Sequence, residues 1–423
     1  MKNLQLYFNP ESKFSDEHET LTEMQIDNSL DLGWKPEDIL LVANFPYEYN
    51  GVKAYVIKGE FQVFDGNRSS KIPMINQLFR ENFFKDGELY WFHDHDAFQL
   101  APMRDPKLGD NVAGFTNHGW NSGWNAGSFF FTSRAKKMFG WIHRSMVQRN
   151  TNEQDALTHI WGRITGYKLL NSTYNVGIYH TQAILKKIDR PLLVAHFHPS
   201  KPHHLEIFKD LIPERLKVIL YKHIADEKIA CLKSLHFDST NRYREWSPYL
   251  SKYHCDTVCE IGIRQGFHFD YIIAHKPKVA VAVDCWVDDG IVGRNDSCHD
   301  QAGLERQYEK FKNNQAKNPF IKIVRAYSFD AVKQFPDDYF DFIFIDADHT
   351  YSGISRDLVD WWPKVKRGGA FAGHDYTHQT RRAVNRQIIK FGVVEAVDEF
   401  VKKNNITTFF TLSPGDTWGM IKI

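Results

Sequence analysis

Cysteine, charge of one sign and long apolar runs are all scarce in this sequence. The 423 residues include only five cysteines and no Cys-x-x-Cys pair, so neither a disulfide framework nor a structural zinc site is expected. The formal net charge of +1 argues against nucleic acid or an anionic membrane surface as a partner. No apolar run approaches the ~20 residues of a membrane span, and the first residues lack the apolar core of a signal peptide. We therefore expect a cytoplasmic protein with reduced thiols. If the protein is viral, the compartment would be the cytoplasm of the host.

The length of the chain predicts two domains, because a single hydrophobic core rarely grows beyond ~250–300 residues. Strand and helix patterns alternate along residues 1–210 and again along residues 251–423, which indicates two α/β domains with largely parallel sheets. Residues 211–250 are charged and rich in helix-forming patterns, and we expect them to be a helical linker. In such sheets, ligands bind beyond the carboxyl ends of the strands.

A strand pattern near Glu260 is followed by a glycine-containing turn and a helix pattern. Gly262 and Gly266 would let the backbone approach a ligand closely, and the N-terminus of the following helix favours polar or anionic groups. The next strand ends at Asp284, where a carboxylate can bind ribose hydroxyls. These features, in this order, predict a nucleoside-containing cofactor. The turn lacks the G-x-G-x-x-G pattern of dehydrogenases, which argues against that class.

A third group of polar residues follows another apolar strand. That strand ends in Asp346 and His349, and a later strand leads to His374 and Asp375. Imidazole and carboxylate groups of this kind can act as a general base and can bind a cation that stabilises a developing negative charge.

Together these motifs resemble the S-adenosylmethionine (SAM)-dependent O-methyltransferases of the macrocin and sugar-methylating type, over about residues 255–423. The resemblance implies a class I methyltransferase with a Rossmann-like, seven-stranded sheet that an antiparallel strand pair closes. It implies that Asp284 binds the ribose of SAM, that Ser328 lies near the adenine and that His349 is the general base. The resemblance also implies that the methionine part of SAM is lined by Glu260, Gly262 and Gly266. It assigns Asp346 both to SAM binding and to catalysis.

Metal dependence of this domain is left open by the sequence. The resemblance implies a divalent metal, Mn²⁺ or Mg²⁺, held by Asp346 and Asp375, and such hard cations prefer carboxylate oxygens. Relatives that use a metal have Glu-Asp where this sequence has His374-Asp375. The alternative is a metal-free site in which the same residues contact SAM and cap the ends of the strands.

An Asp-x-Asp motif follows a strand pattern in the N-terminal domain. Asp94 and Asp96 resemble the metal-binding motif of the GT-A nucleotide-sugar glycosyltransferases. In that class the two carboxylates hold Mn²⁺ or Mg²⁺ against the diphosphate of the donor, because the cation neutralises the leaving nucleoside diphosphate. Asn125 and Gly127 resemble the segment that faces the donor and acceptor sugars, and Asn44 would lie where the nucleotide base is held.

Two further segments resemble the same class. Glu153 and Asp155 match the acidic segment that opens a helix beside the transferred sugar, and the resemblance assigns them to catalysis. A late histidine- and lysine-containing segment resembles the motif of retaining enzymes, in which a histidine is the third metal ligand and Lys201 meets phosphate. The spacing leaves His196 and His198 as alternatives for that ligand, and it leaves retention or inversion open.

The sequence thus predicts a bifunctional enzyme that modifies glycans. One domain would transfer a sugar from a nucleotide-sugar donor, and the other would methylate a hydroxyl of the glycan or glycosylated acceptor with SAM. The main alternative is a SAM-dependent O-methyltransferase of a small glycosylated molecule, with a non-catalytic N-terminal domain that binds the acceptor. A third possibility is an N-terminal domain that serves only for binding or assembly.

Overall fold

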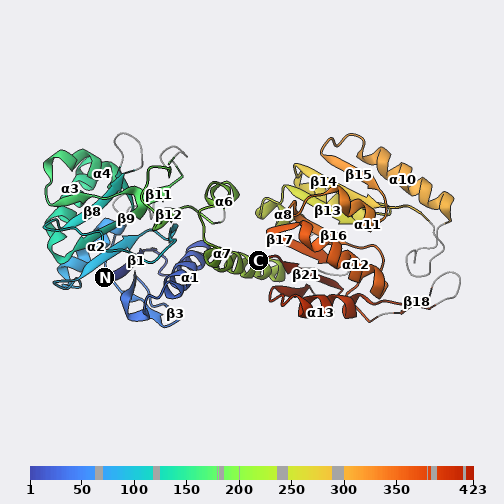
Figure 1. Ribbon diagram of the computed structural model, residues 1–423, viewed down its shortest axis with the longest axis horizontal. Helices are drawn as coiled ribbons and strands as arrows, with labels where there is room; N and C mark the ends of the chain where they lie inside the picture. Colours follow the sequence, from blue (N-terminus) through green and yellow to red (C-terminus); the bar gives the residue numbers. More distant parts are fainter. Residues whose placement is uncertain are drawn as a thin grey trace. The chain divides into compact units, whose positions relative to one another are not determined.

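The chain folds into two compact units, Met1–Leu220 and Tyr221–Ile423, in the computed structural model (Figure 1). Each unit has its own central sheet, covered on both faces by helices, so the predicted α/β class is confirmed for both halves. Helix α7 (Glu214–Ser234) runs across the boundary between the units. The structure describes residues 1–61, 70–117, 124–178, 180, 185–199, 201–235, 246–287, 300–378, 380–382, 388–412 and 416–423.

The sheet of the first unit has seven strands in the order β10-β8-β9-β6-β1-β2-β5. Most neighbours pair in parallel, as the alternation of strands and helices predicts, but β9 runs antiparallel to both β6 and β8. The sheet is therefore mixed. Its strands are β1 (Lys2–Tyr7), β2 (Ile39–Ala43), β5 (Tyr55–Val56), β6 (Leu89–His93), β8 (Ala113–Asn117), β9 (Trp124–Thr132) and β10 (Tyr167–Leu169).

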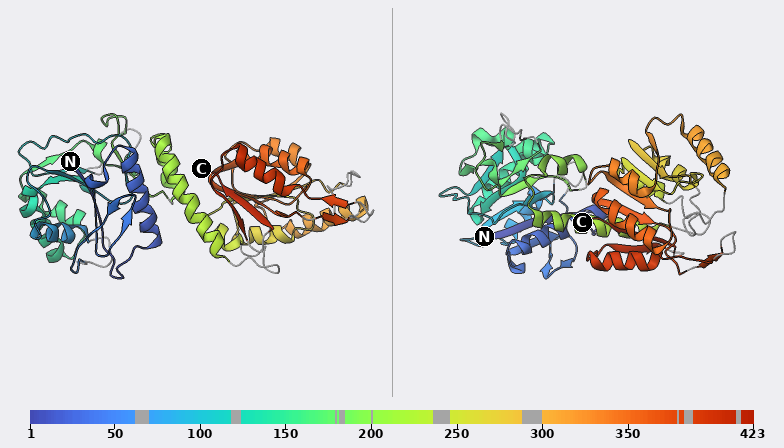
Figure 2. Two further views of the ribbon diagram at one scale, coloured as in Figure 1. Left: turned by 90° about the horizontal axis from the view of Figure 1, so that it is seen from below. Right: turned by 45° about the vertical axis from the view of Figure 1, so that its right-hand side comes forward.

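Helices cover both faces of this sheet (Figure 2). Apolar residues of α2, α3 and α4 pack with Leu4, Leu6 and Val42 on one face, whereas Ile26 of α1 packs with Leu41 on the other. This division follows from the alternation of side chains along a strand. The helices are α1 (Asp16–Asp31), α2 (Lys71–Arg80), α3 (Lys136–Arg149), α4 (Glu153–Ile160) and α6 (Pro202–Phe208).

Two small sheets complete the first unit. The three-stranded sheet β11-β12-β7 begins directly after the Asp-x-Asp motif, since β7 starts at Ala97. Its β7 and β12 are antiparallel. The strands of the small sheets are β7 (Ala97–Gln99), β11 (Val176–Gly177), β12 (Val194–His196), β3 (Glu48–Tyr49) and β4 (Val52–Lys53).

The sheet of the second unit has the order β15-β14-β13-β16-β17-β21-β20. The first five strands are parallel, and β21 lies antiparallel to both β17 and β20. The predicted seven-stranded sheet and its closing antiparallel pair are confirmed. The strands are β13 (Thr257–Ile261), β14 (Val279–Asp284), β15 (Ile321–Arg325), β16 (Phe340–Ile345), β17 (Val365–Gly373), β20 (Phe409–Leu412) and β21 (Thr417–Ile421), with a separate pair of β18 (Thr380–Arg382) and β19 (Ile388–Lys390).

Described helices lie on both faces of the second sheet. Residues of α8, α9 and α10, together with Ala225 and Leu232 of α7, pack with side chains such as Val258 and Phe342, whereas α11, α12 and α13 pack against the opposite face around Cys259 and Ile343. Part of the segment that we expected to be a linker thus belongs to the core of this unit. The helices are α8 (Trp246–Lys252), α9 (Phe267–Ile272), α10 (Gln301–Gln315), α11 (Ser328–Ala331), α12 (Tyr351–Trp361) and α13 (Val393–Lys403).

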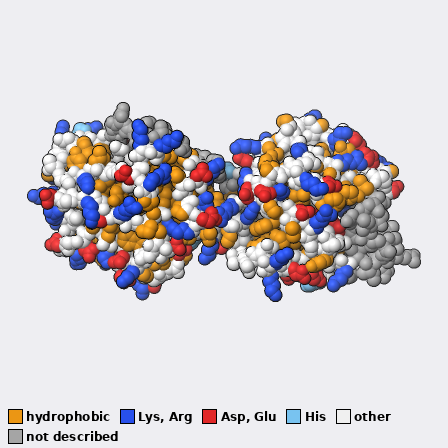
Figure 3. Space-filling model, in the orientation of Figure 1, with side chains coloured by type: hydrophobic (Ala, Val, Ile, Leu, Met, Phe, Trp, Pro, Cys, Tyr) orange, Lys and Arg blue, Asp and Glu red, His pale blue; other side chains and the backbone are white. Residues whose placement is uncertain are grey.

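Charged side chains of both signs are scattered over the face of the molecule in Figure 3, among hydrophobic and other residues, in keeping with the small net charge. Within the described part of the chain, four cysteines are in no disulfide bond, namely Cys231, Cys255, Cys259 and Cys285. Cys298 lies outside the described residues. None of the helices that the structure describes has the length and apolar character required to cross a membrane.

Trp246 provides a test of the place of α8 in the second core. Its side chain is fully buried, and its ring centroid lies 4.8 Å from that of Phe342. We expect Trp246→Ala to lower the free energy of unfolding by about 3–5 kcal/mol, because it leaves a large cavity. Trp141→Ala is the control, since Trp141 is 44% exposed, and it should cost less than about 1 kcal/mol. Equal effects in denaturant titrations would contradict this packing.

Candidate active sites

A cavity of about 670 Å³ lies at the carboxyl edge of the second sheet. This volume is within the usual range of small-molecule sites. The loops that follow β13, β14, β15, β16 and β17 all contribute to its wall, because parallel strands release their loops at the same edge. The cavity brings together every residue that we predicted for this domain: Glu260, Gly262, Gly266, Asp284, Ser328, Asp346, His349 and Asp375.

Gly262 is where two loops of the cavity wall cross. Its φ is +93°, and a Cβ atom there would lie 2.0 Å from the carbonyl oxygen of Asp346. The amide of Asp346 donates to the carbonyl of Ile261 over 2.8 Å, so the loop after β16 is fastened against the end of β13. A glycine is therefore required here both by the backbone conformation and by the close approach of another chain segment.

Asp284, the last residue of β14, anchors the neighbouring part of the wall. Its two carboxylate oxygens accept from the backbone amides of Arg264 (2.7 Å) and Trp286 (2.8 Å). Arg264 and Trp286 both have positive φ values, 55° and 47°. Non-glycine residues rarely adopt this conformation, and such strain tends to occur at functional sites.

Glu260 and His268 form a buried pair on the cavity wall. Glu260 is 2% exposed, and its Oε1 lies 3.0 Å from Nδ1 of His268. Burial raises the pKa of Glu260, and the adjacent imidazole opposes that shift. The other carboxylate oxygen, Oε2, has no hydrogen-bond partner among the described residues. A buried acceptor of this kind is suited to a cationic or hydrogen-bonding ligand.

Asp346, His349 and Asp375 form a compact cluster at the same cavity. Nε2 of His349 lies 3.2 Å from Asp346 and 2.8 Å from Asp375. One potential ligand atom of each residue lies within 4.8 Å of the others, so the set can hold a metal ion. Asp375 has a φ of 57°, and this strained conformation helps to turn its carboxylate towards His349.

Electrostatics in the cluster are dominated by these close pairs. Burial alone would lower the pKa of His349, but the two carboxylates raise it to about 10. His374 is the residue that departs from the Glu-Asp pattern, and its imidazole lies 3.2 Å from Asp375 and 3.4 Å from Asp416. Burial lowers the pKa of His374 as well, and the carboxylates raise it to about 9. The two imidazoles hold the pKa of Asp375 below its usual range against the opposing effect of burial.

Ser328 lies at the end of the cavity beyond Asp284, where its hydroxyl donates to Asp357. Our sequence reasoning missed Asp357, as it missed His268 and Asp416. Asp357 lies within helix α12 and follows no strand, so the pattern of acidic residues at strand ends did not include it.

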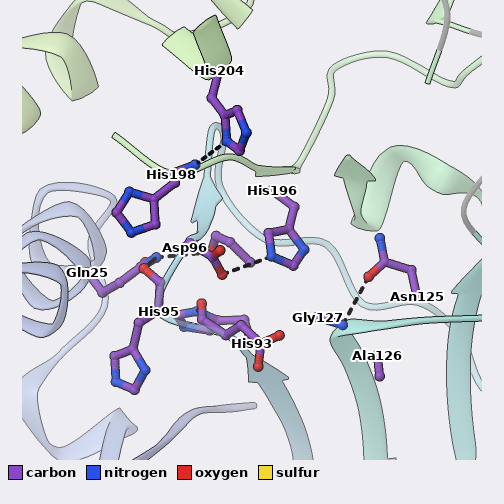
Figure 4. Close-up of polar contacts among 12 residues, drawn as sticks. Gln25, His93, His95, Asp96, Asn125, Ala126, Gly127, His196, His198 and His204 are labelled. Carbon is purple, nitrogen blue, oxygen red and sulfur yellow. Dashed lines mark hydrogen bonds and ion pairs between the residues drawn. The ribbon is translucent and has the colours of Figure 1, made fainter. Parts of the chain in front are cut away.

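A second cluster lies in the first unit, where the Asp-x-Asp motif connects two sheets (Figure 4). β6 ends at His93, and β7 starts at Ala97, which pairs with His196 of β12. This register brings Nε2 of His196 to 2.8 Å from Asp96. One potential ligand atom each of Asp94, Asp96 and His196 lies within 4.8 Å of the others. Burial would raise the pKa of Asp96, but the neighbouring His196 lowers it well below its usual range.

Gly127 and Asn125 border this cluster, as predicted. The amide of Asp94 donates to the carbonyl of Gly127 over 2.8 Å, and the amide of Gly127 donates to the Asn125 side chain over 3.0 Å. A Cβ atom at Gly127 would lie 2.3 Å from the His196 ring. The glycine thus leaves the space that the imidazole occupies.

Lys71, the first residue of α2, is a site residue that the sequence did not reveal. Its ammonium lies 2.7 Å from Asp94 and 3.0 Å from Glu153, and it donates to the carbonyl of Ala126 over 3.2 Å. Burial would lower the pKa of Lys71, but the two carboxylates raise it. A single lysine at the start of a helix carries no distinguishing signal in the sequence.

The remaining residues that we predicted for this unit lie outside the cluster of Asp94, Asp96 and His196. His198 does not join the cluster, since its Nε2 lies 2.8 Å from Glu17, and the structure thus favours His196 as the third ligand. Asp155 accepts from Thr151 and Asn152 at the start of α4 and has no part in the cluster. Among the described residues, two others form no hydrogen bond or ion pair with the cluster: Lys201, which is exposed, and Asn44, whose side-chain amide bonds to the backbone of Asn9.

Residues 259–376 match the model of the family Methyltransf_24, described as a methyltransferase domain. The match covers the strand ends that carry Asp346, His349 and Asp375. It identifies this part of the chain as a methyltransferase domain. A comparison with curated protein sequences finds no match.

Solved structures similar to either half of the chain have low sequence identity. An O-methyltransferase from Bacillus cereus in complex with SAH is 14% identical, with 51% of this chain and 96% of that chain covered and a TM-score of 0.31. The galactosyltransferase LgtC in complex with donor and acceptor sugar analogues is 15% identical, with 52% and 100% covered and a TM-score of 0.36. A glycosyltransferase involved in the glycosylation of the major capsid of PBCV-1 is 13% identical, with 50% and 99% covered and a TM-score of 0.33.

Gly262→Ala tests the loop crossing of the methyltransferase domain. Positive φ and the clash with Asp346 act together, so we expect a loss of roughly 3 kcal/mol or more in the free energy of unfolding. Gly33→Ala is the control, because Gly33 has a φ of +87° and nothing within 4 Å of its Cβ position. It should cost about 1–2 kcal/mol. Equal losses in thermal or denaturant unfolding would show that the close approach adds nothing.

Proposed function

We propose that the chain is a bifunctional enzyme that modifies glycans. Its C-terminal unit methylates a sugar hydroxyl with SAM, and its N-terminal unit transfers a sugar from a nucleotide-sugar donor. The observation that carries the proposal is the Asp346–His349–Asp375 cluster at one cavity of the methyltransferase domain. The separate cluster of Asp94, Asp96 and His196 supports the second activity.

SAM would lie along the carboxyl edge of the second sheet. Glu260, on the central strand β13, has an unpartnered carboxylate oxygen that can accept from the ammonium of the methionine part. Asp284, on the adjacent β14, can bind ribose hydroxyls with the lone pairs that its backbone contacts leave. Ser328 follows β15 at the far end, which suits the adenine. The reactive methyl group is then left on the side of β16 and β17, where His349 lies.

His349 is the proposed general base. An acceptor hydroxyl oxygen would attack the methyl carbon, so that a C–O bond forms while the C–S bond breaks, and the hydroxyl proton would pass to an imidazole nitrogen of His349. The products are a methyl ether and S-adenosylhomocysteine. An imidazole between Asp346 and Asp375 holds its proton firmly, but the positive sulfonium of bound SAM favours the neutral form.

Asp346 and Asp375 have the ligand chemistry for a divalent cation. Their carboxylates face one point, and hard cations such as Mg²⁺ or Mn²⁺ prefer oxygen ligands. A cation there would stabilise the negative charge that develops on the acceptor oxygen. The metal-free alternative is supported by His374, whose imidazole already provides a cationic group next to Asp375.

His349→Ala tests the role of the base. We expect kcat for methyl transfer to fall by about 100- to 10,000-fold, as is typical when a general base is removed. The dissociation constant of S-adenosylhomocysteine should stay within about threefold of the wild-type value, because His349 faces the acceptor and not the nucleoside. His159→Ala, which removes an exposed imidazole of the other unit, is the control. An unchanged kcat in His349→Ala would exclude His349 as the base.

The N-terminal cluster is suited to the diphosphate of a sugar donor. Asp94, Asp96 and His196 offer two oxygens and one nitrogen, a set that fits Mn²⁺ or Mg²⁺. A divalent cation would neutralise the nucleoside diphosphate as the bond to the sugar breaks. Glu153 lies next to this cluster through Lys71, and its buried Oε2 has no hydrogen-bond partner among the described residues. This oxygen can accept from a hydroxyl of the transferred sugar.

One contact favours the alternative of a non-catalytic, acceptor-binding N-terminal unit. The ammonium of Lys71 already neutralises Asp94 at 2.7 Å, so the cluster is stable without a metal. Under this alternative the domain would bind the glycosylated acceptor, and methylation would be the sole reaction of the chain.

Asp96→Asn distinguishes the two possibilities. Wild-type protein with Mn²⁺ and a panel of nucleotide sugars should slowly release a nucleoside diphosphate from one donor. We expect Asp96→Asn to lower that rate by roughly 100-fold, because a neutral amide is a poor metal ligand and the charge on the leaving group is less well neutralised. Asp110→Asn, at an exposed carboxylate, is the matched control. Release from no donor by a wild-type protein that still binds S-adenosylhomocysteine would support the acceptor-binding alternative.

A further inference from the structure

The ammonium group of Lys71 lies at the N-terminal cluster, where a divalent cation would also find negative charge. Its Nζ atom donates to both carboxylate oxygens of Asp94, over 2.7 and 3.0 Å. Asp94 is one of the three residues that can hold a metal ion there, together with Asp96 and His196. Lys71 thus engages both oxygen atoms that Asp94 could offer to a metal.

Further contacts define the position of this ammonium group. It lies 3.0 Å from Oε1 of Glu153 and donates to the carbonyl of Ala126 over 3.2 Å. The centroid of the Phe92 ring lies 5.3 Å away, within the range of a cation–π contact. An ammonium group has three N–H donors, and two carboxylates and a carbonyl are enough to satisfy all of them. These contacts favour the observed position as long as no other cation is present.

A divalent cation at the cluster would conflict with Lys71. The two positive charges would share Asp94 and would repel each other at short range. The aspartate is the less mobile partner, because its side chain is short and its backbone amide donates to the carbonyl of Gly127 over 2.8 Å. Lys71 has a flexible four-carbon side chain, so its ammonium group can move to another acceptor. The oxygens of a diphosphate that arrives with the cation provide such acceptors.

We propose that Lys71 is an exchangeable internal cation of the donor site. It neutralises Asp94 before any ligand binds, and it moves to the diphosphate when a divalent cation takes its place at the carboxylate. This inference rests on the proposed function of the N-terminal unit, and it assigns to Lys71 the coupling between the two ligands. The protein should therefore bind a divalent cation weakly on its own, whereas the cation and the diphosphate should strengthen each other's binding.

Binding of Mn²⁺ to the full chain, measured by isothermal titration calorimetry, tests this exchange. All proteins carry Asp346→Asn, which removes a carboxylate ligand from the C-terminal cluster. The two titrants are Mn²⁺ alone and its preformed complex with inorganic pyrophosphate. We expect Lys71→Met to bind Mn²⁺ alone about 10- to 100-fold more tightly than the protein with Lys71, because a competing charged hydrogen-bond donor is removed. The complex with pyrophosphate should bind about tenfold or more tightly than Mn²⁺ alone when Lys71 is present, but only within about threefold in Lys71→Met.

Lys107→Met is the matched control, because Lys107 forms an exposed ion pair with Asp105 and should leave both affinities unchanged. Asp96→Asn should abolish binding and so assigns the bound metal to this cluster. Equal affinities for Mn²⁺ with and without the Lys71→Met change would overturn the proposal. If Lys71→Met fails to fold, a protein with Lys71 that binds Mn²⁺ as tightly without pyrophosphate as with it would overturn the proposal as well. Proteins that bind neither titrant would instead contradict the proposed donor site.

Discussion

The parallel pairing of β13 and β16 is the constraint on which the methyltransferase site depends. Neighbouring parallel strands must release their loops at the same edge of the sheet, and here the two loops cross in van der Waals contact. The hydrogen bond from Asp346 to Ile261 fixes that crossing, and Gly262 makes room for it. Once Asp346 is fixed, His349 follows within the same loop. Asp375 then faces His349, because β17 is the next parallel strand.

In the first unit, a different connection between strands brings the carboxylates and the histidine together. Its Asp-x-Asp motif lies where the chain leaves the large sheet and enters the small one, so Asp94 and Asp96 follow a strand and also precede one. The antiparallel register of β7 and β12 then decides which histidine joins them. His196 pairs with Ala97 and reaches Asp96, whereas His198 lies two residues beyond and meets Glu17. Spacing in the sequence could not make this choice, since it contains no information about register.

Acidic residues at strand ends could be predicted from the sequence, because a short continuous apolar run that stops at a carboxylate is a local signal. Asp284, Asp346 and the Asp-x-Asp motif all belong to this class. Lys71 and Asp357 could not be found in this way: each lies on a helix, and its role depends on which loop that helix happens to cover. The direction of a strand could not be predicted from the sequence either, so the antiparallel course of β9 in the first sheet was found only in the structure. Asp155 was assigned to catalysis because it lies in the same acidic segment as Glu153. In the structure, its carboxylate instead accepts from Thr151 and Asn152 at the start of the helix.

The two clusters share a feature that bears on how each would bind its ligands. Both combine two aspartates with a histidine, and each keeps a side-chain cation beside a carboxylate of the set: Lys71 at Asp94 and His374 at Asp375. A buried pair of carboxylates without such a partner would repel, and one of them would take up a proton. The internal cations thus favour the charged form of both pairs before any ligand arrives. A divalent cation that entered either site would have to compete with a positive group already in place. The arrangement of the carboxylates is therefore formed in advance, but the affinity of the site for a metal ion is lowered.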